Sequence, residues 1–160
     1  MEPLLLHLRK EQFKFSAAHM TVFPDGTKES LHGHNFQVEL TLTLLSREMV
    51  PFSVYKDALK NIVKNWDERV LIAERCPQFT RENASMGSLQ FSLCGKKYLL
   101  PEDEVVLLPV DNISSERLAE QLLFLFVEEL GPSHLSQLRE IALRLDESPG
   151  QGVTCIWRAP

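Results

Sequence analysis

The strongest structural pattern in the chain lies at residues 31–43, which read Leu-His-Gly-His-Asn-Phe-Gln-Val-Glu-Leu-Thr-Leu-Thr. From Phe36 onward apolar and polar residues alternate, which is typical of a β-strand with one buried face. Side chains two positions apart on a strand point to the same side of the sheet, so His32 and His34 open the apolar row. The stretch therefore predicts a half-buried strand whose core-facing row begins with two histidines.

The segment before it predicts a second strand. Residues 13–19 read Phe-Lys-Phe-Ser-Ala-Ala-His, so the apolar positions and His19 share one face. If the two strands pair as an antiparallel hairpin, the loop over residues 20–31 brings His19 beside His32 and His34. Gly33 would let the two backbones approach closely.

Three converging imidazoles indicate a metal site. Imidazole nitrogens suit Zn²⁺, and three protein ligands leave one position open for water or substrate, which is typical of a catalytic centre. The alternative is that these are histidines at the core edge, satisfied by hydrogen bonds. A His-x-His pair alone is a weak signal, but its spacing from His19 and the strand context favour zinc bound by His19, His32 and His34.

Composition limits the remaining classes. A chain of 160 residues with 44% hydrophobic content is expected to form a single domain over residues 1–160. No stretch approaches the roughly 20 apolar residues needed to cross a bilayer. The three cysteines are odd in number and far apart, which favours reduced thiols and a cytoplasmic protein. A net charge of −5 without a basic cluster argues against nucleic acid or membrane partners and favours a small molecule.

Helical periodicity appears twice in the rest of the chain. Apolar residues recur at helical spacing over Val54–Trp66, and a second helix is expected to begin at Ser114-Ser115-Glu116 and to stop at Gly131-Pro132. Strands are expected at residues 141–145 and 153–157. The element order is strand, strand, helix, helix, strand, strand, so the fold class is α+β.

Residues of about 74–104 interrupt this order. Prolines and glycines break the pattern, and the segment is interpreted as an insertion outside the core. Within it, Leu89–Leu93 and Tyr98–Leu100 could form a short hairpin about Cys94-Gly95.

One carboxylate lies at an unusual position. Glu147 falls on the same face as Ile141, Leu143 and Leu145, at the end of that strand. It is either a solvated strand end or a carboxylate that accepts two N–H groups of a planar heterocycle.

These motifs together resemble the family of 6-pyruvoyl-tetrahydropterin and 6-carboxy-tetrahydropterin synthases. The resemblance covers most of the chain except residues 74–104. It rests on five motifs, which are Phe15-Ser16-Ala17-Ala18-His19, Leu31-His32-Gly33-His34-Asn35-Phe36, Trp66-Asp67-Glu68-Arg69-Val70-Leu71, Ile113-Ser114-Ser115-Glu116-Arg117-Leu118-Ala119 and Arg144-Leu145-Asp146-Glu147-Ser148-Pro149.

The resemblance implies a tunnelling fold. In that fold a four-stranded antiparallel sheet carries two helices on one face in the order ββααββ, and copies close into an oligomeric barrel. A homotrimer or homohexamer with active sites between subunits is therefore expected. The family's zinc ligands match His19, His32 and His34, its pterin-anchoring carboxylate matches Glu147, and its pterin-pocket element matches Ser114, Ser115 and Glu116.

The chain departs from the family pattern at the proton-transfer residues. Family synthases place a cysteine shortly before His-Gly-His, whereas Gly26 to Lys28 contain none, and the family's Asp-His pair reads Asp67-Glu68 here. Glu29 lies three residues before His32, which resembles one branch of the family that uses a glutamate in place of the cysteine. That branch is associated with side-chain cleavage to 6-hydroxymethyl-dihydropterin. Glu29, Asp67 and Glu68 are thus the catalytic candidates. Glu29 would need burial to raise its pKa from about 4.3 towards neutrality, and otherwise it is a solvated loop carboxylate.

Three functional hypotheses follow. The first is a zinc-dependent lyase acting on 7,8-dihydroneopterin triphosphate or a related pterin, by side-chain cleavage or triphosphate elimination. In it zinc acidifies the side-chain hydroxyls and Glu29 moves the proton. The second is a catalytically degenerate protein that still binds zinc and pterin. The third is an enzyme acting on another pterin-like or purine-like ligand.

Overall fold

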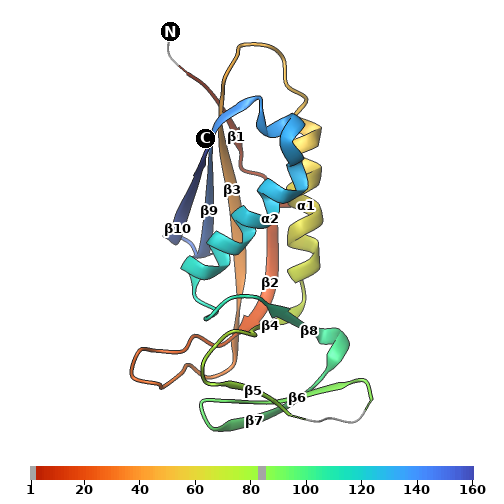
Figure 1. The fold of residues 1–160 in the computed structure, drawn as a ribbon, viewed down its shortest axis with the longest axis vertical. Helices are drawn as coiled ribbons and strands as arrows, with labels where there is room; N and C mark the ends of the chain where they lie inside the picture. The colour runs from red at the N-terminus through yellow and green to blue at the C-terminus, as the bar shows by residue number, and fades with distance from the viewer. Residues whose placement is uncertain (1–2, 83–85) are drawn as a thin grey trace.

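The computed structural model describes residues 3–82 and 86–160, which form two β-sheets and two long helices (Figure 1). The larger sheet has seven strands in the order β10-β9-β3-β2-β4-β8, with β1 also paired to β3. Its strands are β1 (Leu4–Leu8), β2 (Lys14–His19), β3 (His32–Leu44), β4 (Arg69–Ala73), β8 (Val105–Leu108), β9 (Leu138–Ser148) and β10 (Gln151–Arg158). The smaller sheet contains β5 (Phe79–Glu82), β6 (Ser88–Leu93) and β7 (Lys96–Pro101).

The four predicted antiparallel strands are confirmed. They are β10, β9, β3 and β2, which lie side by side in the large sheet. The register pairs His19 with His32 and Val38 with Leu145. The alternation predicted for both N-terminal strands holds, because the core-facing side chains of β2 and β3 from Phe36 onward are buried.

The sheet is larger than predicted, because three further strands extend it. β1 pairs antiparallel with the far half of β3, for instance Leu6 with Leu42. β4 runs parallel to β2, and β8 runs parallel to β4. These strands have only four or five residues and consist largely of continuous apolar runs, so they carry no alternation from which a strand could be identified.

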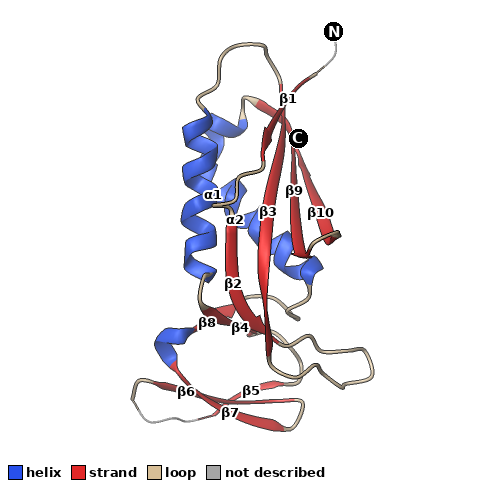
Figure 2. Cartoon of the chain, turned by 180° about the vertical axis from the view of Figure 1, so that it is seen from behind, coloured by secondary structure: helices blue, strands red, loops and turns tan. Residues whose placement is uncertain are grey.

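Both helices cover one face of the large sheet. They are α1 (Phe52–Trp66) and α2 (Ser115–Leu135). In Figure 2, which shows the molecule from behind, α2 lies behind the strands and α1 lies beside β2. α2 begins where predicted, since the Ser114 hydroxyl accepts a hydrogen bond from the Arg117 N–H. The predicted stop is also confirmed, because Gly131 adopts a non-helical φ of 66° and only a short helical turn follows.

The helices and the sheet meet in one aromatic-rich core. Phe15 of β2 stacks on Phe36 of β3 with ring centroids 4.9 Å apart, and Trp66 at the end of α1 packs edge-on against Phe15 at 5.6 Å. These rings lie directly behind the histidine-bearing strand ends, since His19 and His34 each contact Phe36. The core therefore supports the strand ends that carry the histidines.

The segment over residues 74–104 has an apolar row of its own. The predicted hairpin about Cys94-Gly95 is confirmed as β6 and β7, and β5 adds a third strand. The expectation that this segment lies outside the core is wrong for Leu89, Phe91 and Leu93, which are buried. The small sheet lies beyond the end of the large sheet where β2 ends and β3 begins (Figures 1 and 2), and residues 83–85 lie outside the described part of the chain.

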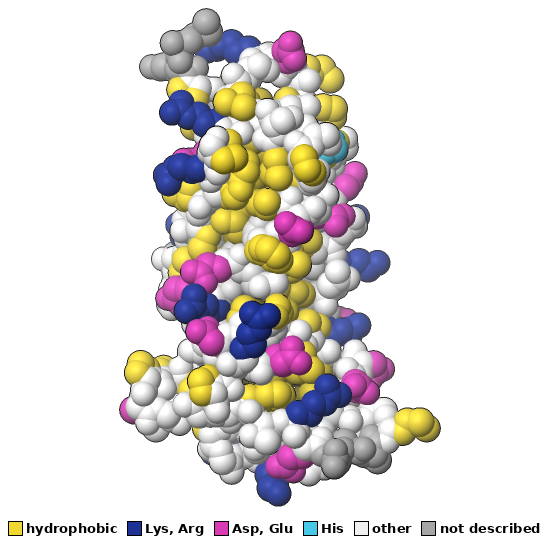
Figure 3. Space-filling view, viewed as in Figure 1, with side chains coloured by type: hydrophobic (Ala, Val, Ile, Leu, Met, Phe, Trp, Pro, Cys, Tyr) yellow, Lys and Arg dark blue, Asp and Glu magenta, His cyan; other side chains and the backbone are white. Residues whose placement is uncertain are grey.

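The surface is not uniformly polar. Figure 3 shows hydrophobic side chains gathered along the middle of the face seen in Figure 1. Phe124 of α2 and Ile156 of the edge strand β10 are among the exposed large hydrophobic residues, and both line a groove between these elements. In the described part of the chain, no helix combines the length and apolarity required to cross a membrane.

Candidate metal centre

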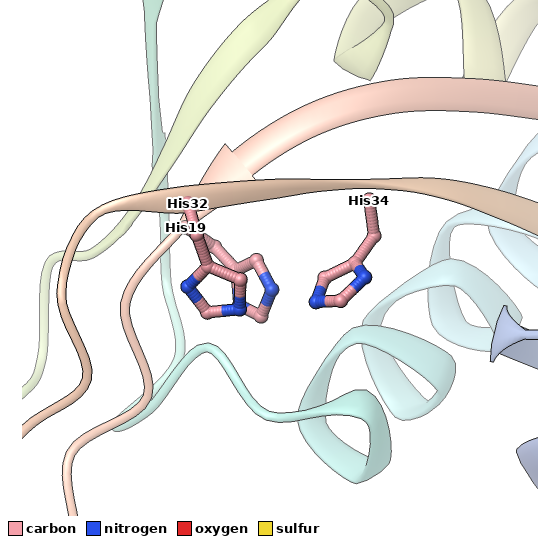
Figure 4. A group of neighbouring side chains, drawn as sticks. All are labelled: His19, His32 and His34. Carbon is pink, nitrogen blue, oxygen red and sulfur yellow. The ribbon is translucent and has the colours of Figure 1, made fainter.

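Three histidines converge at one end of the large sheet (Figure 4). His19 is the last residue of β2, and His32 and His34 lie at the start of β3. Their ring centroids are 4.7 to 5.3 Å apart, and one nitrogen of each lies within 4.8 Å of the others. The strands also approach closely at Gly33, where an added Cβ would lie 3.2 Å from the Ala17 carbonyl oxygen. The predicted convergence of the three imidazoles is confirmed.

Backbone carbonyls fix the orientation of two of the rings. Nδ1 of His19 lies 3.1 Å from the Ile113 carbonyl oxygen, and Nδ1 of His32 lies 2.8 Å from the Ser30 carbonyl oxygen. A carbonyl oxygen can only accept a hydrogen bond, so each Nδ1 carries the proton. Each Nε2 then presents a lone pair towards the cluster, as a metal ligand requires.

The buried ring of His19 shows that the cluster fits a metal ion. His19 is 1% exposed, and burial lowers its pKa although the bond to Ile113 acts in the opposite direction. The neutral imidazole is the form that binds metals. Its Nε2 is buried with no hydrogen-bond partner among the described residues. An unpaired buried polar atom costs about 1–3 kcal/mol, and a cation bound by the three nitrogens would satisfy it.

Glu147 is not a solvated strand end. It lies near the end of β9, its side chain is 18% exposed, and its Oε1 is 3.4 Å from Nε2 of His19 and 3.5 Å from Nε2 of His34. The same side chain lines a cavity of about 280 Å³ beside the histidines. The other walls of this cavity are Thr21, Glu29, Ser114, Ser115, Glu116, Gln151, Gly152 and Val153. One cavity thus brings together Glu29 and all four residues predicted to bind substrate.

The start of α2 supplies polar groups to this cavity. Hydrogen bonding to Ser114 holds the pKa of Glu116 below its ordinary value. Glu116 is therefore a carboxylate at neutral pH and can only accept hydrogen bonds. With Glu147 and the two serine hydroxyls it makes a wall suited to a ligand rich in N–H donors.

Glu29 lies on the loop between β2 and β3, with its Oε2 3.9 Å from Nε2 of His32. Thr21 fixes it, because the Thr21 N–H donates to the carboxylate at 3.2 Å and the Glu29 N–H donates to the Thr21 carbonyl at 3.0 Å. Burial raises the pKa of Glu29, but hydrogen bonding from Thr21 and the nearby imidazoles outweighs burial, and the pKa is lowered. The condition for Glu29 to be a strong base, a pKa raised towards neutrality by burial, is therefore not met.

Residues far apart in sequence hold the Glu29 loop in place. The Asn112 side chain accepts the Val22 N–H at 2.9 Å and donates to the Val22 carbonyl at 2.8 Å. At the other end of the loop, Lys28 Nζ donates to the Glu29 carbonyl at 2.9 Å and lies 5.2 Å from the centre of the Tyr98 ring in β7. Sequence reasoning missed these contacts, since no periodic pattern links residue 22 to 112 or 28 to 98.

Asp67 and Glu68 lie apart from the cavity that Glu29 lines. The Asp67 carboxylate accepts the Ser16 N–H at 2.8 Å, and Glu68 has a positive φ of 56°. Glu68 lines a second cavity of about 350 Å³, whose walls include His34 and Asn35. Among residues 3–82 and 86–160, neither carboxylate forms a hydrogen bond or ion pair with a histidine of the cluster.

The fold and the site define a class of protein, an α+β domain with a cluster of three histidines that could hold a metal ion beside a carboxylate-lined pocket. The sequence model of the family described as 6-pyruvoyl tetrahydropterin synthase matches residues 7–156. The chain belongs to this family.

Relatives and solved structures agree with this assignment. A protein of Methanocaldococcus jannaschii with the provisional name 6-carboxy-5,6,7,8-tetrahydropterin synthase is 26% identical over 143 residues, covering 87% of this chain and 86% of its own length. A Pyrococcus horikoshii protein with the same provisional name is 28% identical over 139 residues, covering 85% and 81%. The 6-pyruvoyl tetrahydropterin synthase structures of Plasmodium vivax and Plasmodium falciparum superpose with a TM-score of 0.91 at 22% and 23% identity, each covering 99% of this chain and 100% of its own. The structures establish the shared fold.

Proposed function

We propose that this protein is a zinc-dependent lyase that acts on 7,8-dihydroneopterin triphosphate or a related pterin. The observation that carries the proposal is the convergence of the three imidazoles beside a cavity that also contains Glu29 and Glu147. A metal site and a pocket for an N–H-rich heterocycle lie side by side, as chemistry on the side chain of a bound pterin requires. Family membership supports the pterin as ligand.

Each residue has a distinct role in this proposal. His19, His32 and His34 would hold zinc, which when bound supplies a Lewis acid that lowers the pKa of a substrate hydroxyl. Glu147, Ser114, Ser115 and Glu116 would hold and orient the pterin ring by accepting and donating hydrogen bonds. Glu29 would take up the hydroxyl proton. Because the pKa of Glu29 is lowered, its carboxylate is a weak base, and proton transfer to it would depend on zinc lowering the pKa of the substrate hydroxyl.

We favour side-chain cleavage over triphosphate elimination, because the chain resembles the branch of the family that uses a glutamate in place of the cysteine and is associated with cleavage to 6-hydroxymethyl-dihydropterin. In the Plasmodium vivax synthase, two variants replace a glutamate that is named as a catalytic residue, by alanine and by cysteine. That protein therefore offers a precedent for a catalytic glutamate in this family. Glu29, which stands close to the histidines where this chain lacks a cysteine, is the corresponding candidate here.

Asp67 and Glu68 enter the proposal through a second copy of the chain. We expect a homotrimer or homohexamer in which Glu68 of one copy faces the Glu29 cavity of the next. The second cavity supports this arrangement, because an open, carboxylate-lined hollow at the strand ends could close against a neighbour. The exposed edge strand β10 and the apolar groove beside it are also surfaces that oligomerisation would cover.

The test is product analysis with protein of known metal content. Zinc-loaded protein is incubated with 7,8-dihydroneopterin triphosphate, and the pterins are separated by chromatography. We expect 6-hydroxymethyl-dihydropterin to form with zinc and not after chelation. Recovery of unchanged substrate would refute the lyase proposal.

A catalytically degenerate zinc- and pterin-binding protein is the second candidate. The observation that favours it is the absence of the family's cysteine between Gly26 and Lys28, together with Glu68 in place of the relay histidine. Saturable pterin binding that depends on Glu147, without product, would support this candidate.

A further inference from the structure

The carboxylate of Glu147 occupies a position that a pterin-binding role alone does not explain. Its Oε1 is nearly equidistant from two imidazole nitrogens, at 3.4 Å from His19 Nε2 and 3.5 Å from His34 Nε2. Ligand atoms about 2.0–2.1 Å from a tetrahedral zinc ion are separated from one another by about 3.3–3.4 Å. The oxygen therefore stands at the separation expected of a fellow ligand.

The fold holds Glu147 in this position. β9 pairs with β3 in a register that sets Leu145 opposite Val38 and Asp146 opposite Gln37. The next residue along β9, Glu147, therefore lies near the end of β3 that carries His34. The side chain of Glu147 is on the core-facing row of β9, so it points towards the imidazoles rather than to the opposite face.

The charges around Glu147 indicate a cation between these groups. Its neighbour Asp146 is paired with Arg144 at 2.6 Å. In the described part of the chain, Glu147 has no such partner from Lys or Arg, and its ion-pair contacts are the two imidazoles. With Nδ1 of His19 protonated, the Nε2 lone pair faces a carboxylate oxygen, and two acceptors at this distance repel unless a proton or a metal ion lies between them.

We propose that Glu147 is a fourth ligand of the metal in the substrate-free protein, and that a pterin displaces it. This inference rests on the zinc site of the proposed function and adds a second role for Glu147. A carboxylate that accepts two N–H groups of the pterin ring uses both oxygens and must turn away from the metal, so binding of the ring would release it and open a coordination position. Pterin binding and carboxylate ligation are therefore coupled, and each weakens the other by the same factor.

Metal affinity tests the first half of the inference. The chelator-stripped full chain is titrated with Zn²⁺ against a chromophoric chelator. Glu147→Gln, which keeps the size and loses the charge, is expected to weaken zinc binding by about 10- to 100-fold. The matched control is Glu116→Gln, a carboxylate in the same cavity with no contact to the imidazoles among the described side chains, and it should change the affinity less than twofold. Wild-type affinity in Glu147→Gln would overturn the inference.

Cobalt spectroscopy tests the second half. Co²⁺ replaces zinc, and neopterin, an oxidised pterin, is added as the probe. The visible spectrum of the wild-type protein should change on neopterin addition, because a carboxylate leaves the metal. The Glu147→Gln protein lacks the carboxylate ligand before neopterin is added, so its spectrum should change less. A spectral change as large as that of the wild type would overturn the proposed displacement. Neither readout requires turnover, and failure of the lyase assay would refute the proposed function without affecting these two results.

Discussion

The three histidines and Glu29 are neighbours in space but are held in different ways. The histidines lie at the ends of two paired strands, where the sheet register sets His19 opposite His32 and the core rings lie behind them. Glu29 lies on a loop whose position depends on a few side-chain contacts to Asn112 and Tyr98. The proposed metal ligands are thus part of the sheet, whereas the proposed proton-transfer residue, Glu29, lies on a loop attached to the sheet.

This difference has a consequence for substitutions. A change at a histidine removes a ligand from a rigid frame, so the effect should be large and confined to the metal. A change in the contacts of the loop should leave the metal in place and shift only the position of Glu29. A histidine variant should therefore lose both metal and turnover, whereas a loop variant should lose turnover and keep the metal.

The largest effect is expected from His32→Ala. Removing one of three nitrogens should abolish stoichiometric zinc binding and lower turnover by about a thousandfold or more, since Lewis-acid stabilisation is worth several kcal/mol. The fold should persist, because His32 is only partly buried at the start of β3. Metal analysis and thermal unfolding measure both effects. The control is His7→Ala, which removes an exposed histidine of β1, and full zinc occupancy in His32→Ala would contradict the assignment.

Glu29→Gln should separate the two halves. The amide keeps the hydrogen bond from the Thr21 N–H but cannot accept a proton at neutral pH, so kcat should fall about a hundredfold or more while zinc content stays at the wild-type level. Chromatography of quenched time points measures kcat, and metal analysis of the same sample measures the zinc content. Glu11→Gln, at an exposed carboxylate beside Lys14, serves as the control. An unchanged rate in Glu29→Gln would show that another group moves the proton.

The same division explains what the sequence could predict. Strand alternation places residues on faces, so residues 13–19 and 31–43 sufficed to predict the hairpin and its three histidines. The face of Glu147 followed from the spacing of Ile141, Leu143 and Leu145. The strands β4 and β8 were not predicted, because short apolar runs that pair in parallel show no periodicity in the sequence. The lowered pKa of Glu29 could not be predicted either, since it depends on hydrogen bonds from Thr21, on the opposite side of the loop.

Asn112→Leu is expected to have the next largest effect. The Asn112 amide forms two hydrogen bonds with the backbone of Val22, and typical net values of about 1 kcal/mol each predict a loss of up to about thirtyfold in kcat if the loop shifts. Hydrogen exchange of residues 20–31 should rise while zinc content is unchanged. Asn61→Leu makes the same chemical change on the exposed side of α1. Normal loop protection in Asn112→Leu would show that the Thr21 hydroxyl, which donates to the Ile113 carbonyl at 3.1 Å, suffices to hold the loop.

The smallest effect should come from Tyr98, and a pair of substitutions can isolate it. Tyr98 stacks on the buried ring of Phe91, and the Lys28 ammonium lies 5.2 Å from the centre of the Tyr98 ring. The same ammonium donates a hydrogen bond to the Glu29 carbonyl. A cation over an aromatic ring at a partly exposed site contributes about 0.5–1 kcal/mol, so Tyr98→Leu should lower kcat about two- to fivefold, with faster exchange in residues 20–31. Tyr98→Phe keeps the ring and should behave like the wild type. Lys28→Met removes the charge and leaves the stack on Phe91 intact, so it distinguishes loss of the cation contact from damage to the small sheet. If all three variants matched the wild type in rate and exchange, the small sheet would not support the Glu29 loop, and Asn112 would be its main anchor.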